Sequence, residues 1–421
     1  MTSTVKLTET QIAVDWVGQF EIEHQATAIE LLDAMTLVSH EEFMSGLRAQ
    51  LIRRGQELTG VVGLYAEREL RKWRGIPNRL FKEERRVPRR AFGAGPQPVQ
   101  STHAYDPEVG SEGLIANVVT QIRRELPAKY LSHPGPDQIR RRHVRTFALV
   151  TDFIGSGKRV CEYLDAAWRI ASVKSWWSAG LLRFEVVGYA ASAIGRKNVE
   201  NHITKPLVTL VAGCPTIYTE FSDDNLDRIR DLCIDYDPRD RDEFDSLGFG
   251  GIGVLLAFAH GIPNNAPRLL HKSKRGGREP WNALFPARVT SNVNATFGRR
   301  SDNASIMQRL TRMGQIRLAE GPWVGEATES AKKMTLVLAA LARGPRLEEI
   351  VARRTGLTLL EVRALINSAK ALQWVDQRLR ITDVGFNQLK HARSLREDLP
   401  LSNKPNTFYY PKLLRAPREP I

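Results

Sequence analysis

The segment from Phe147 to Arg159, FALVTDFIGSGKR, contains the residue types best suited to chemistry in this chain. Four apolar residues and Thr151 lead to Asp152, and two more apolar residues precede a Gly155-Ser156-Gly157 turn. A strand that ends in a glycine-rich turn at the start of a helix directs backbone N–H groups and the positive end of the helix dipole at one point. We therefore predict an anion site at this turn, with a phosphate as its natural occupant.

A Walker A loop, another phosphate-binding turn between a strand and a helix, does not fit the segment. It requires a glycine five residues before Gly157 and a Ser or Thr directly after Lys158. Those two positions hold Asp152 and Arg159. A nucleoside triphosphatase of this type is therefore excluded.

The same segment resembles the phosphoribosyl pyrophosphate signature of type I phosphoribosyltransferases. In that family four apolar residues lead to two acidic residues, two apolar residues and a Thr/Ser-Gly turn followed by Thr. The resemblance implies that Asp152 holds the ribose hydroxyls, that Mg²⁺ accompanies the ligand, and that the turn and its neighbours bind the 5′-phosphate. The implied ligand-binding residues are Thr151, Gly155, Ser156, Gly157 and Lys158.

The chain departs from this signature at two positions. Thr151 stands at the first acidic position, and Arg159 stands where the family has its final Thr. Half of the ribose clamp is therefore missing from the segment, which leaves turnover open. An ordinary strand-turn-helix joint of another α/β fold remains the alternative interpretation.

A second polar group, His260, Asn264 and Asn265, follows the apolar run 253–259. In α/β sheets, ligands bind beyond the carboxyl ends of the strands, so we expect these side chains to hydrogen-bond a base or a pyrophosphate. A turn built around the asparagines after Pro263 is the alternative.

The two motifs lie in a region where strand and helix patterns alternate. Strands are predicted at 60–66, 144–150, 181–189, 207–212 and 253–259, and helices at 113–126, 158–173, 197–202 and 225–233. This order predicts an α/β domain with a parallel, helix-flanked sheet, which we place at 59–300. Apolar residues at helical spacing predict a helical N-terminal region at 1–58.

The last hundred residues show a different pattern. Short helices are predicted at 332–341 and 347–354, a third helix begins at a Thr358/Glu361 capping box and runs to about 372, and 374–381 alternates like a hairpin. This order predicts a winged helix-turn-helix at 328–395, followed by a docking tail at 396–421. Its predicted nucleic-acid contacts are Arg363 and Lys370 on the third helix, with Arg378 and Arg380 on the wing. A protein-interaction module is the alternative.

Positive charge is concentrated in two places. The 421 residues carry a formal charge of +14, and residues 331–421 hold 17 Lys and Arg against 8 Asp and Glu. Residues 68–90 hold 10 basic and 3 acidic residues. We expect a nucleic-acid partner from this distribution, although a charge run can also be a solvated face. The candidates in the second run are Arg85, Arg86, Arg89 and Arg90.

Neither a membrane partner nor a metal centre is predicted. No apolar run approaches the length of a spanning helix and the first residues are polar, so we expect a cytoplasmic protein. The three cysteines are too few and too scattered for a disulfide framework or a zinc site, and we assign no metal ligand.

A broader resemblance covers most of the chain. The helical N-terminus, the phosphoribosyltransferase-like core, the string 259–265 (AHGIPNN), Trp281 and the 284–286 turn resemble the phosphoribosyltransferase-like effectors of bacterial antiphage systems. With the winged helix, the chain is most similar to effectors encoded beside retron reverse transcriptases. The resemblance implies a toxin that the reverse transcriptase, its RNA and its multicopy single-stranded DNA hold inactive until a phage disturbs them.

Three functions stay open at this point. The first is that effector, acting on or binding a phosphoribosyl or nucleotide ligand as a glycosyl transferase or a nucleotide N-glycosidase. The second is a ligand-sensing winged-helix transcription regulator whose phosphoribosyltransferase-like domain is catalytically silent. The third is a structural subunit whose basic surfaces hold a reverse transcriptase and its nucleic acid.

Overall fold

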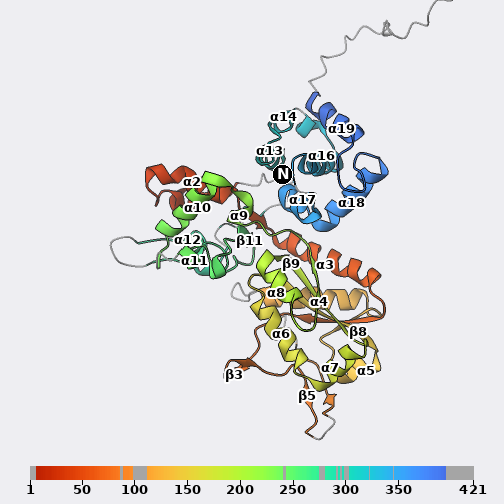
Figure 1. Ribbon diagram of the computed structural model, residues 1–421. Coiled ribbons are helices and arrows are strands. Elements are labelled where there is room, and N and C mark those ends of the chain that lie inside the picture. Colours follow the sequence, from red (N-terminus) through yellow and green to blue (C-terminus); the bar gives the residue numbers. More distant parts are fainter. Residues whose placement is uncertain are drawn as a thin grey trace, which may run out of the picture.

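The computed structural model describes ten stretches of the chain: 6–85, 89–97, 111–239, 243–274, 280–290, 293, 296–297, 303–321, 323–344 and 346–394. Figure 1 shows three parts: a core built on a sheet, a second body that includes α2 and α10, and a C-terminal group of helices. Among the described helices, none combines the length and the apolar composition that crossing a membrane requires.

The core is a five-stranded parallel sheet with the strand order β10-β9-β8-β2-β7. The strands are β2 (Val61–Ala66), β7 (Tyr130–Ser132), β8 (Val144–Ile154), β9 (Arg183–Ala191) and β10 (Leu207–Leu210). Because side chains alternate along a strand, Leu149 and Val150 of β8 enter two different hydrophobic clusters on opposite faces. This sheet confirms the predicted fold class.

Helices cover both faces of this sheet. The cluster with Val150 includes residues of α3 (His40–Glu57) and α4 (Ser111–Glu125). The cluster with Leu149 includes residues of α5 (Pro136–Arg141), α6 (Lys158–Trp168), α7 (Ala171–Ser178) and α8 (Ala193–Glu200). The strand β8 lies in the middle of the sheet; its pairing with β2 ends at Val150, and its carboxyl end continues to Ile154 along β9 alone.

The fifth predicted strand does not extend this sheet. Only Leu256–Phe258 (β11) is a strand, and it pairs in parallel with β1 (Thr36–Val38) in a separate two-stranded sheet. The chain bends just before this strand, where Gly250, Gly251 and Gly253 all have positive φ, and Val254 forms only an isolated bridge to Thr216. The prediction of a strand within 253–259 is therefore confirmed for residues 256–258, but its placement in the same sheet as the other strands was wrong.

The second body joins the N-terminal helices to residues 217–297. It contains η1 (Leu7–Glu9), α1 (Gln11–Val17), α2 (Ile22–Asp33), α9 (Ile217–Glu220), α10 (Asp223–Asp235), α11 (Glu243–Ser246), η3 (Phe249–Gly251), α12 (Arg268–His271) and η4 (Pro286–Arg288). Its core includes a cluster of aromatic rings in which Trp16, Phe20 and Trp281 meet edge to face at 4.7–5.9 Å between ring centroids. The predicted N-terminal helices thus pack on a segment more than 200 residues away.

Two small antiparallel hairpins leave the core after β2. They are β3 (Lys72–Trp73) with β4 (Ile76–Pro77), and β5 (Lys82–Glu83) with β6 (Ala91–Phe92). Figure 1 shows both at the end of the core remote from the C-terminal helices. They contain most of the basic run predicted at 68–90.

In the described residues from 303 to 394, every named element is a helix. α13 (Asn303–Arg312), α14 (Ile316–Ala319) and α15 (Trp323–Glu326) precede the predicted trio α16 (Glu329–Ala342), α17 (Glu348–Thr355) and α18 (Leu359–Ala371), and α19 (Asp383–Ser394) ends the described chain. The capping box at Thr358 and Glu361 is confirmed by reciprocal hydrogen bonds of 3.2 and 2.9 Å. The tail predicted at 396–421 lies outside the described residues.

The predicted wing is smaller than expected. The segment 374–381 contains no strand, only one antiparallel bridge between Val375 and Ile381. The carboxylate of Asp376 accepts the backbone N–H groups of Arg378 and Arg380 at 2.8 Å each, so this side chain closes the loop in place of a strand ladder. The small hairpin predicted here is therefore reduced to a loop closed by a single antiparallel bridge.

Candidate functional site

The two polar motifs meet in one cavity of about 850 Å³. One wall is the end of β8, the glycine turn and the first turn of α6. The opposite wall comes from the second body, residues 258–265 and 287–289. The predicted site residues in the lining are Asp152, Gly155, Ser156, Gly157, Lys158, His260, Asn264 and Asn265. Thr151 is fully buried directly behind Asp152.

The glycine turn is held from behind by α8. The hydroxyl of Ser192, the N-cap of α8, donates to the Gly155 carbonyl at 2.6 Å, and the Asn198 amide donates to the Ser156 carbonyl at 3.0 Å. Gly157 has a φ of +79° and is the N-cap of α6. Because two carbonyl oxygens of the turn are bonded to α8, the turn is rigid at the positive end of the α6 dipole.

Asp152 is an ionised carboxylate at the bottom of the cavity. Its Oδ2 lies 3.7 Å from Nε2 of His260, and its Oδ1 accepts the Phe153 backbone N–H at 2.7 Å. Burial raises the pKa of Asp152, but the interaction with His260 and the hydrogen bonds from Ser111 and Phe153 outweigh it. The net pKa lies below the ordinary value, so a negative charge stays fixed in the cavity.

His260 is held by aromatic packing on its ring faces. It stacks on Phe258 at 4.9 Å and meets the edge of Phe43 at 4.8 Å. Its side chain is only 10% exposed, and neither ring nitrogen has a hydrogen-bond partner among the described residues. A buried ring with unbonded nitrogens in a cavity wall is suited to bind a ligand.

The two asparagines take different positions in the same wall. Asn264 is exposed at the cavity, whereas Asn265 is 3% exposed and its amide donates to the Phe249 carbonyl at 2.7 Å. A Cβ at Gly155 would lie 2.0 Å from the Asn265 side-chain oxygen. Asn265 therefore packs between the second body and the glycine turn, and Asn264 is the asparagine exposed at the cavity.

A second carboxyl, which the sequence analysis missed, enters the cavity from the neighbouring strand. Glu67 directly follows β2 and lines the cavity at 3% exposure. Its Oε2 lies 3.3 Å from the Thr151 hydroxyl, which is also 3.4 Å from Asp152 Oδ1. The carboxyl that the sequence lacks at position 151 is thus supplied by β2. An acidic residue directly after an apolar strand was the signal that could have found it.

The pKa of Glu67 is raised to about 7: burial is the largest cause, the Arg159 charge lowers the pKa, and the nearby charges of Asp152 and Glu112 add to the rise. Arg159 donates to Glu67 Oε1 at 3.0 Å and to Glu112 Oε1 at 2.8 Å. Arg159, which stands where the signature has its final Thr, therefore connects two acidic residues of the cavity, Glu67 and Glu112.

The raised pKa of Glu67 predicts a pH-dependent stability. Its folded-state pKa of about 7 lies above the ordinary value of 4.5, so its contribution is fully present below about pH 4.5 and is lost as the pH rises through 7. The loss is on the order of 3 kcal/mol. Glu67→Gln stays neutral, and we expect its urea unfolding free energy to lack this decline.

Glu69→Gln is the matched control, because Glu69 is an exposed carboxyl two residues further along the chain. It should keep the decline of the unaltered protein. Equal pH slopes for Glu67→Gln and the unaltered protein would contradict the burial of an ionisable Glu67.

The described residues do not provide a cage for the Mg²⁺ that the resemblance implies. Asp152 is engaged with His260 and Glu67 with Arg159. The one group of three side chains with metal-binding spacing in the described chain is Glu21, Glu23 and His24, which begins α2 outside the cavity. We derive no step through a metal ion.

The predicted nucleic-acid contacts lie at opposite ends of the molecule. Arg85, Arg89 and Arg90 are exposed beside the β5–β6 hairpin, and Arg86 lies outside the described residues. In the winged helix, Arg378 and Arg380 are exposed and Lys370 is half-buried, whereas Arg363 forms an ion pair with Glu348 at 2.5 Å. No single face collects both sets.

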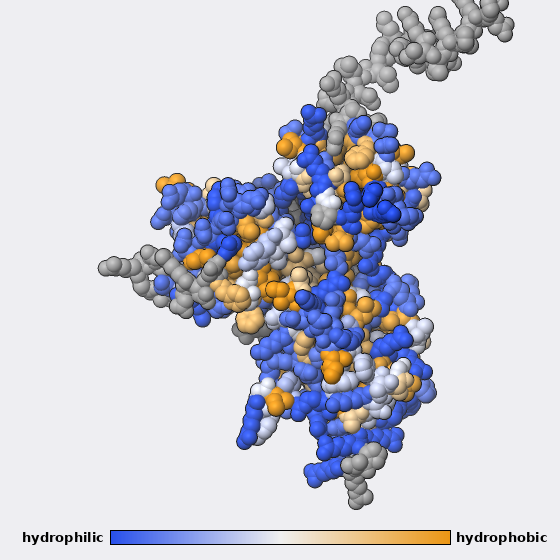
Figure 2. All heavy atoms as spheres, in the orientation of Figure 1, coloured by the Kyte–Doolittle hydropathy of each residue, from blue (hydrophilic) through white to orange (hydrophobic). Residues whose placement is uncertain are grey.

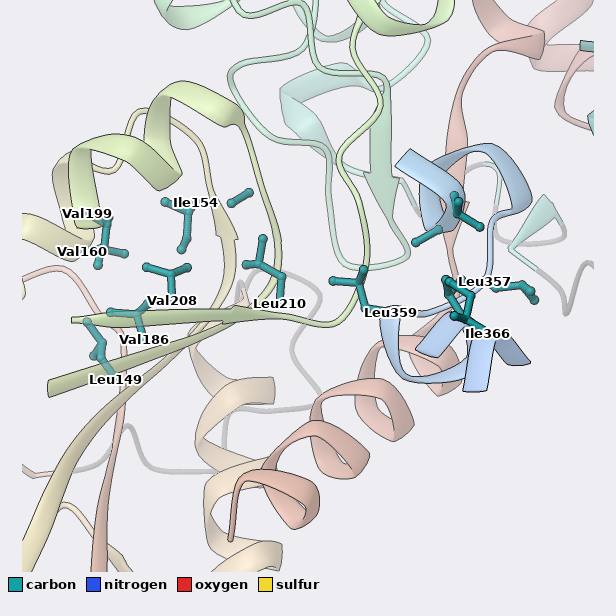
Figure 3. Close-up of a cluster of buried hydrophobic side chains, with 14 of the residues drawn as sticks. Leu149, Ile154, Val160, Val186, Val199, Val208, Leu210, Leu357, Leu359 and Ile366 are labelled. Atoms are coloured by element: carbon teal, nitrogen blue, oxygen red, sulfur yellow. The ribbon is translucent and has the colours of Figure 1, made fainter. Parts of the chain in front are cut away.

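The predicted recognition helix α18 begins against the core. The Leu359 N–H donates to the Val211 carbonyl at 2.8 Å, and the Leu359 side chain is 5% exposed. Figure 3 shows that the buried cluster continues from Val208 and Leu210 of the sheet to Leu357, Leu359 and Ile366. The amino-terminal turn of a recognition helix is the part that reads base edges. In this protein the amino-terminal turn of α18 is covered by the core, through the contact of Leu359 with Val211.

Two ion pairs flank this contact. Arg353 of α17 lies 3.3 Å from Glu220 of the second body, and Glu349 of α17 pairs with Arg196 of α8. Since α8 also braces the glycine turn, one short helix contacts both the cavity and the winged helix.

Comparisons with known proteins match two parts of the chain. The family model described as PRTase-CE matches residues 14–287, and the model described as wHTH-PRTase associated matches residues 335–416. The first match covers the cavity lining except Arg288 and Val289, and the second begins within α16 and covers the rest of the predicted winged helix. Searches of curated proteins and of solved structures found no match.

Proposed function

Because this chain belongs to the PRTase-CE family, and combines a phosphoribosyltransferase-like core with a winged-helix region, we propose that its cavity binds a phosphoribosyl or nucleotide ligand. The 5′-phosphate would lie at the turn 155–157 and the start of α6, and Asp152 would accept hydrogen bonds from the ribose hydroxyls. The observation that carries the proposal is the convergence of this turn, Asp152 and His260 on one cavity.

The cavity also suits chemistry at the anomeric carbon of the ribose. Cleavage of a glycosidic bond passes through an oxocarbenium-like state, which a fixed anion stabilises. Asp152 would supply that charge because its pKa lies below the ordinary value. Glu67, with a pKa of about 7, would exchange a proton with the leaving or attacking group near neutral pH. Two carboxyls whose pKa values are pushed apart are a recurring arrangement for such a division of roles.

We further propose that the protein is the effector of a retron-type antiphage system, acting in the cytoplasm as a toxin. The reverse transcriptase and its RNA and single-stranded DNA would hold it inactive. The basic composition and the two exposed arginine-rich regions support a nucleic-acid partner. The substrate would be a nucleotide, a cofactor or a nucleic acid with an accessible ribose.

The test is a mass-spectrometric nucleotide profile of cells that express this chain alone. We expect one nucleotide or cofactor pool to collapse with the unaltered chain and not with Asp152→Ala, because the latter loses the anion beside the ribose. Asp165→Ala is the matched control, since Asp165 is an acidic residue of α6 outside the cavity lining.

Collapse with Asp165→Ala and not with Asp152→Ala would support the assignment. Identical profiles for all three proteins, each folded and expressed, would overturn the proposal that this chain depletes a metabolite.

A ligand-sensing regulator is the second candidate, and one contact favours it. α8 touches both the glycine turn and α17 of the winged helix, so a ligand at the turn has a short physical path to the docked helices. In this case ligand binding would change the affinity for duplex DNA, and no metabolite would be consumed.

A further inference from the structure

The β3–β4 hairpin exposes large apolar side chains. Trp73 is 73% exposed and Ile76 is 53% exposed. Figure 2 shows the projecting hairpin as a largely hydrophilic surface with a small hydrophobic patch. Exposed apolar groups gathered on a projection indicate a contact site for a partner.

The hairpin holds these two side chains in a defined geometry. Arg74 and Gly75 both have positive φ, which is the backbone of a type I′ turn. Trp73 and Ile76 are paired across the strands, so their side chains share one face. The Trp73 ring is therefore presented on a tight turn.

The base of the hairpin is fastened to α6. Lys72 Nζ contacts Glu162 at 2.7 Å, and the Arg169 guanidinium donates to the Pro77 carbonyl at 2.5 Å. Because Glu162 lies on α6 and Arg169 is the C-cap of the same helix, the exposed tip extends from a rigid support. Glu162 is one helical turn beyond Lys158, so the hairpin stands beside the cavity's α6 wall.

Positive charge surrounds the exposed ring. The Arg74 guanidinium lies 6.0 Å from the centre of the Trp73 ring. Five exposed arginines of the two hairpins form no ion pair with any described residue; they are Arg71, Arg74, Arg85, Arg89 and Arg90. Phe92 on the β5–β6 hairpin is a second aromatic ring, at 40% exposure.

The second hairpin is fastened to the adjoining helix. Glu83 accepts the Ala171 N–H at 2.7 Å, and the Ala91 N–H donates to the Ser172 hydroxyl at 2.9 Å. Both contacts are at the start of α7, which follows α6. The two hairpins thus rest on consecutive helices, and we call their exposed basic and aromatic side chains together the hairpin surface.

We propose that the hairpin surface binds single-stranded nucleic acid, with Trp73 stacking on an unpaired base and the free arginines neutralising the neighbouring phosphates. Base stacking on aromatic side chains together with a cationic groove is how proteins hold single strands without sequence preference. A duplex conceals the base faces, so it offers Trp73 nothing to stack on. The inference stands on the hairpins alone and does not depend on which ligand the cavity takes.

The test measures the affinity of the full chain for a fluorescein-labelled oligothymidylate by anisotropy. Trp73→Ala should weaken binding roughly tenfold or more, since stacking accounts for about 1–3 kcal/mol per base. Trp73→Phe should retain part of the affinity because it keeps an aromatic face. Ile22→Ala is the matched control, since Ile22 is 90% exposed in the second body.

Salt dependence gives an independent readout. Arg74→Ala should lower the slope of log affinity against log salt by about 0.7, the value for one phosphate contact on a single strand. Arg124→Ala, an exposed arginine on α4, should leave the slope unchanged. A blunt duplex should show no dependence on Trp73.

Two results would overturn the proposal. One is oligothymidylate affinity that stays within twofold of the unaltered chain in Trp73→Ala. The other is the absence of single-strand binding by the unaltered chain at low salt, which would leave the hairpin surface for a protein partner. Failure of this test leaves the cavity's function untouched, because the metabolite profile does not use Trp73.

Discussion

Replacing Gly195 with alanine is expected to weaken binding of phosphoribosyl pyrophosphate by at least about tenfold and to lower the thermal unfolding temperature. A Cβ at Gly195 would lie 2.1 Å from the Gly155 carbonyl oxygen and 2.7 Å from that of Ile154. Both are backbone atoms of the β8 end and the glycine turn, so the turn itself must move. Overpacking of this kind costs about 1–3 kcal/mol.

Ile194→Ala is the matched control for this prediction. Ile194 neighbours Gly195 in α8 but is 55% exposed, so its truncation should change neither quantity. Ser192→Ala is a milder second variant, which removes the hydroxyl that donates to the Gly155 carbonyl without adding bulk. The measurements are calorimetric titration and thermal unfolding. A Gly195→Ala protein that binds the ligand as tightly as the unaltered chain would show that the turn is not part of the site.

Release of the winged helix is expected to create duplex DNA binding that the docked protein lacks. Arg196→Glu combined with Glu220→Arg breaks the ion pairs to Glu349 and Arg353 and places like charges opposite each other. The surface of the winged helix itself stays unaltered, and the net charge does not change. We expect duplex affinity to rise at least about tenfold, because the first turn of α18 becomes accessible.

The control for release is a reversed ion pair elsewhere. Arg48→Glu with Glu125→Arg exchanges the partners of a pair between α3 and α4 that is 2.7 Å long, again without a change in net charge. This variant should bind duplex no better than the unaltered chain. Anisotropy with a labelled duplex gives the affinity, and limited proteolysis reports release. If the released variant undocks yet gains no duplex affinity, the winged helix is a protein-interaction module.

Much of the cavity was predictable because its residues follow buried strands in the sequence. Asp152 and the glycine turn were found from an apolar run, an acidic residue and a turn, and His260 from the end of a second run. The sequence could not show that this second run belongs to a separate small sheet. A buried strand is apolar whether it belongs to the core sheet or to the small sheet, and its own residues do not show which strand it pairs with.

Glu67 was missed for a related reason. The resemblance directs attention to position 151 of the same strand, whereas the second carboxyl comes from the end of β2, 84 residues earlier. Which strands are neighbours in a parallel sheet is decided by tertiary packing. Only the strand order β8-β2 brings Thr151 and Glu67 within hydrogen-bonding distance.

The docking of the winged helix was equally invisible in the sequence. Leu357, Leu359 and Ile366 fit an amphipathic helix whose apolar side faces its own module. An apolar face of a helix predicts that this face is buried, but it does not show which part of the protein packs against it. The arginines of the wing are exposed, and their contact with nucleic acid stays a prediction, whereas the first turn of α18 is an interface within the chain.

Calorimetric titration of the unaltered chain with phosphoribosyl pyrophosphate tests the central claim most directly. The account predicts saturable binding with one site per chain, weakened in Gly195→Ala and Asp152→Asn and retained in Ile194→Ala. It also predicts competition by ribose 5-phosphate, which shares the phosphate and the hydroxyls. No binding by the folded, unaltered chain, or binding that is indifferent to both Asp152 and Gly195, would contradict the claim that this cavity is a phosphoribosyl site.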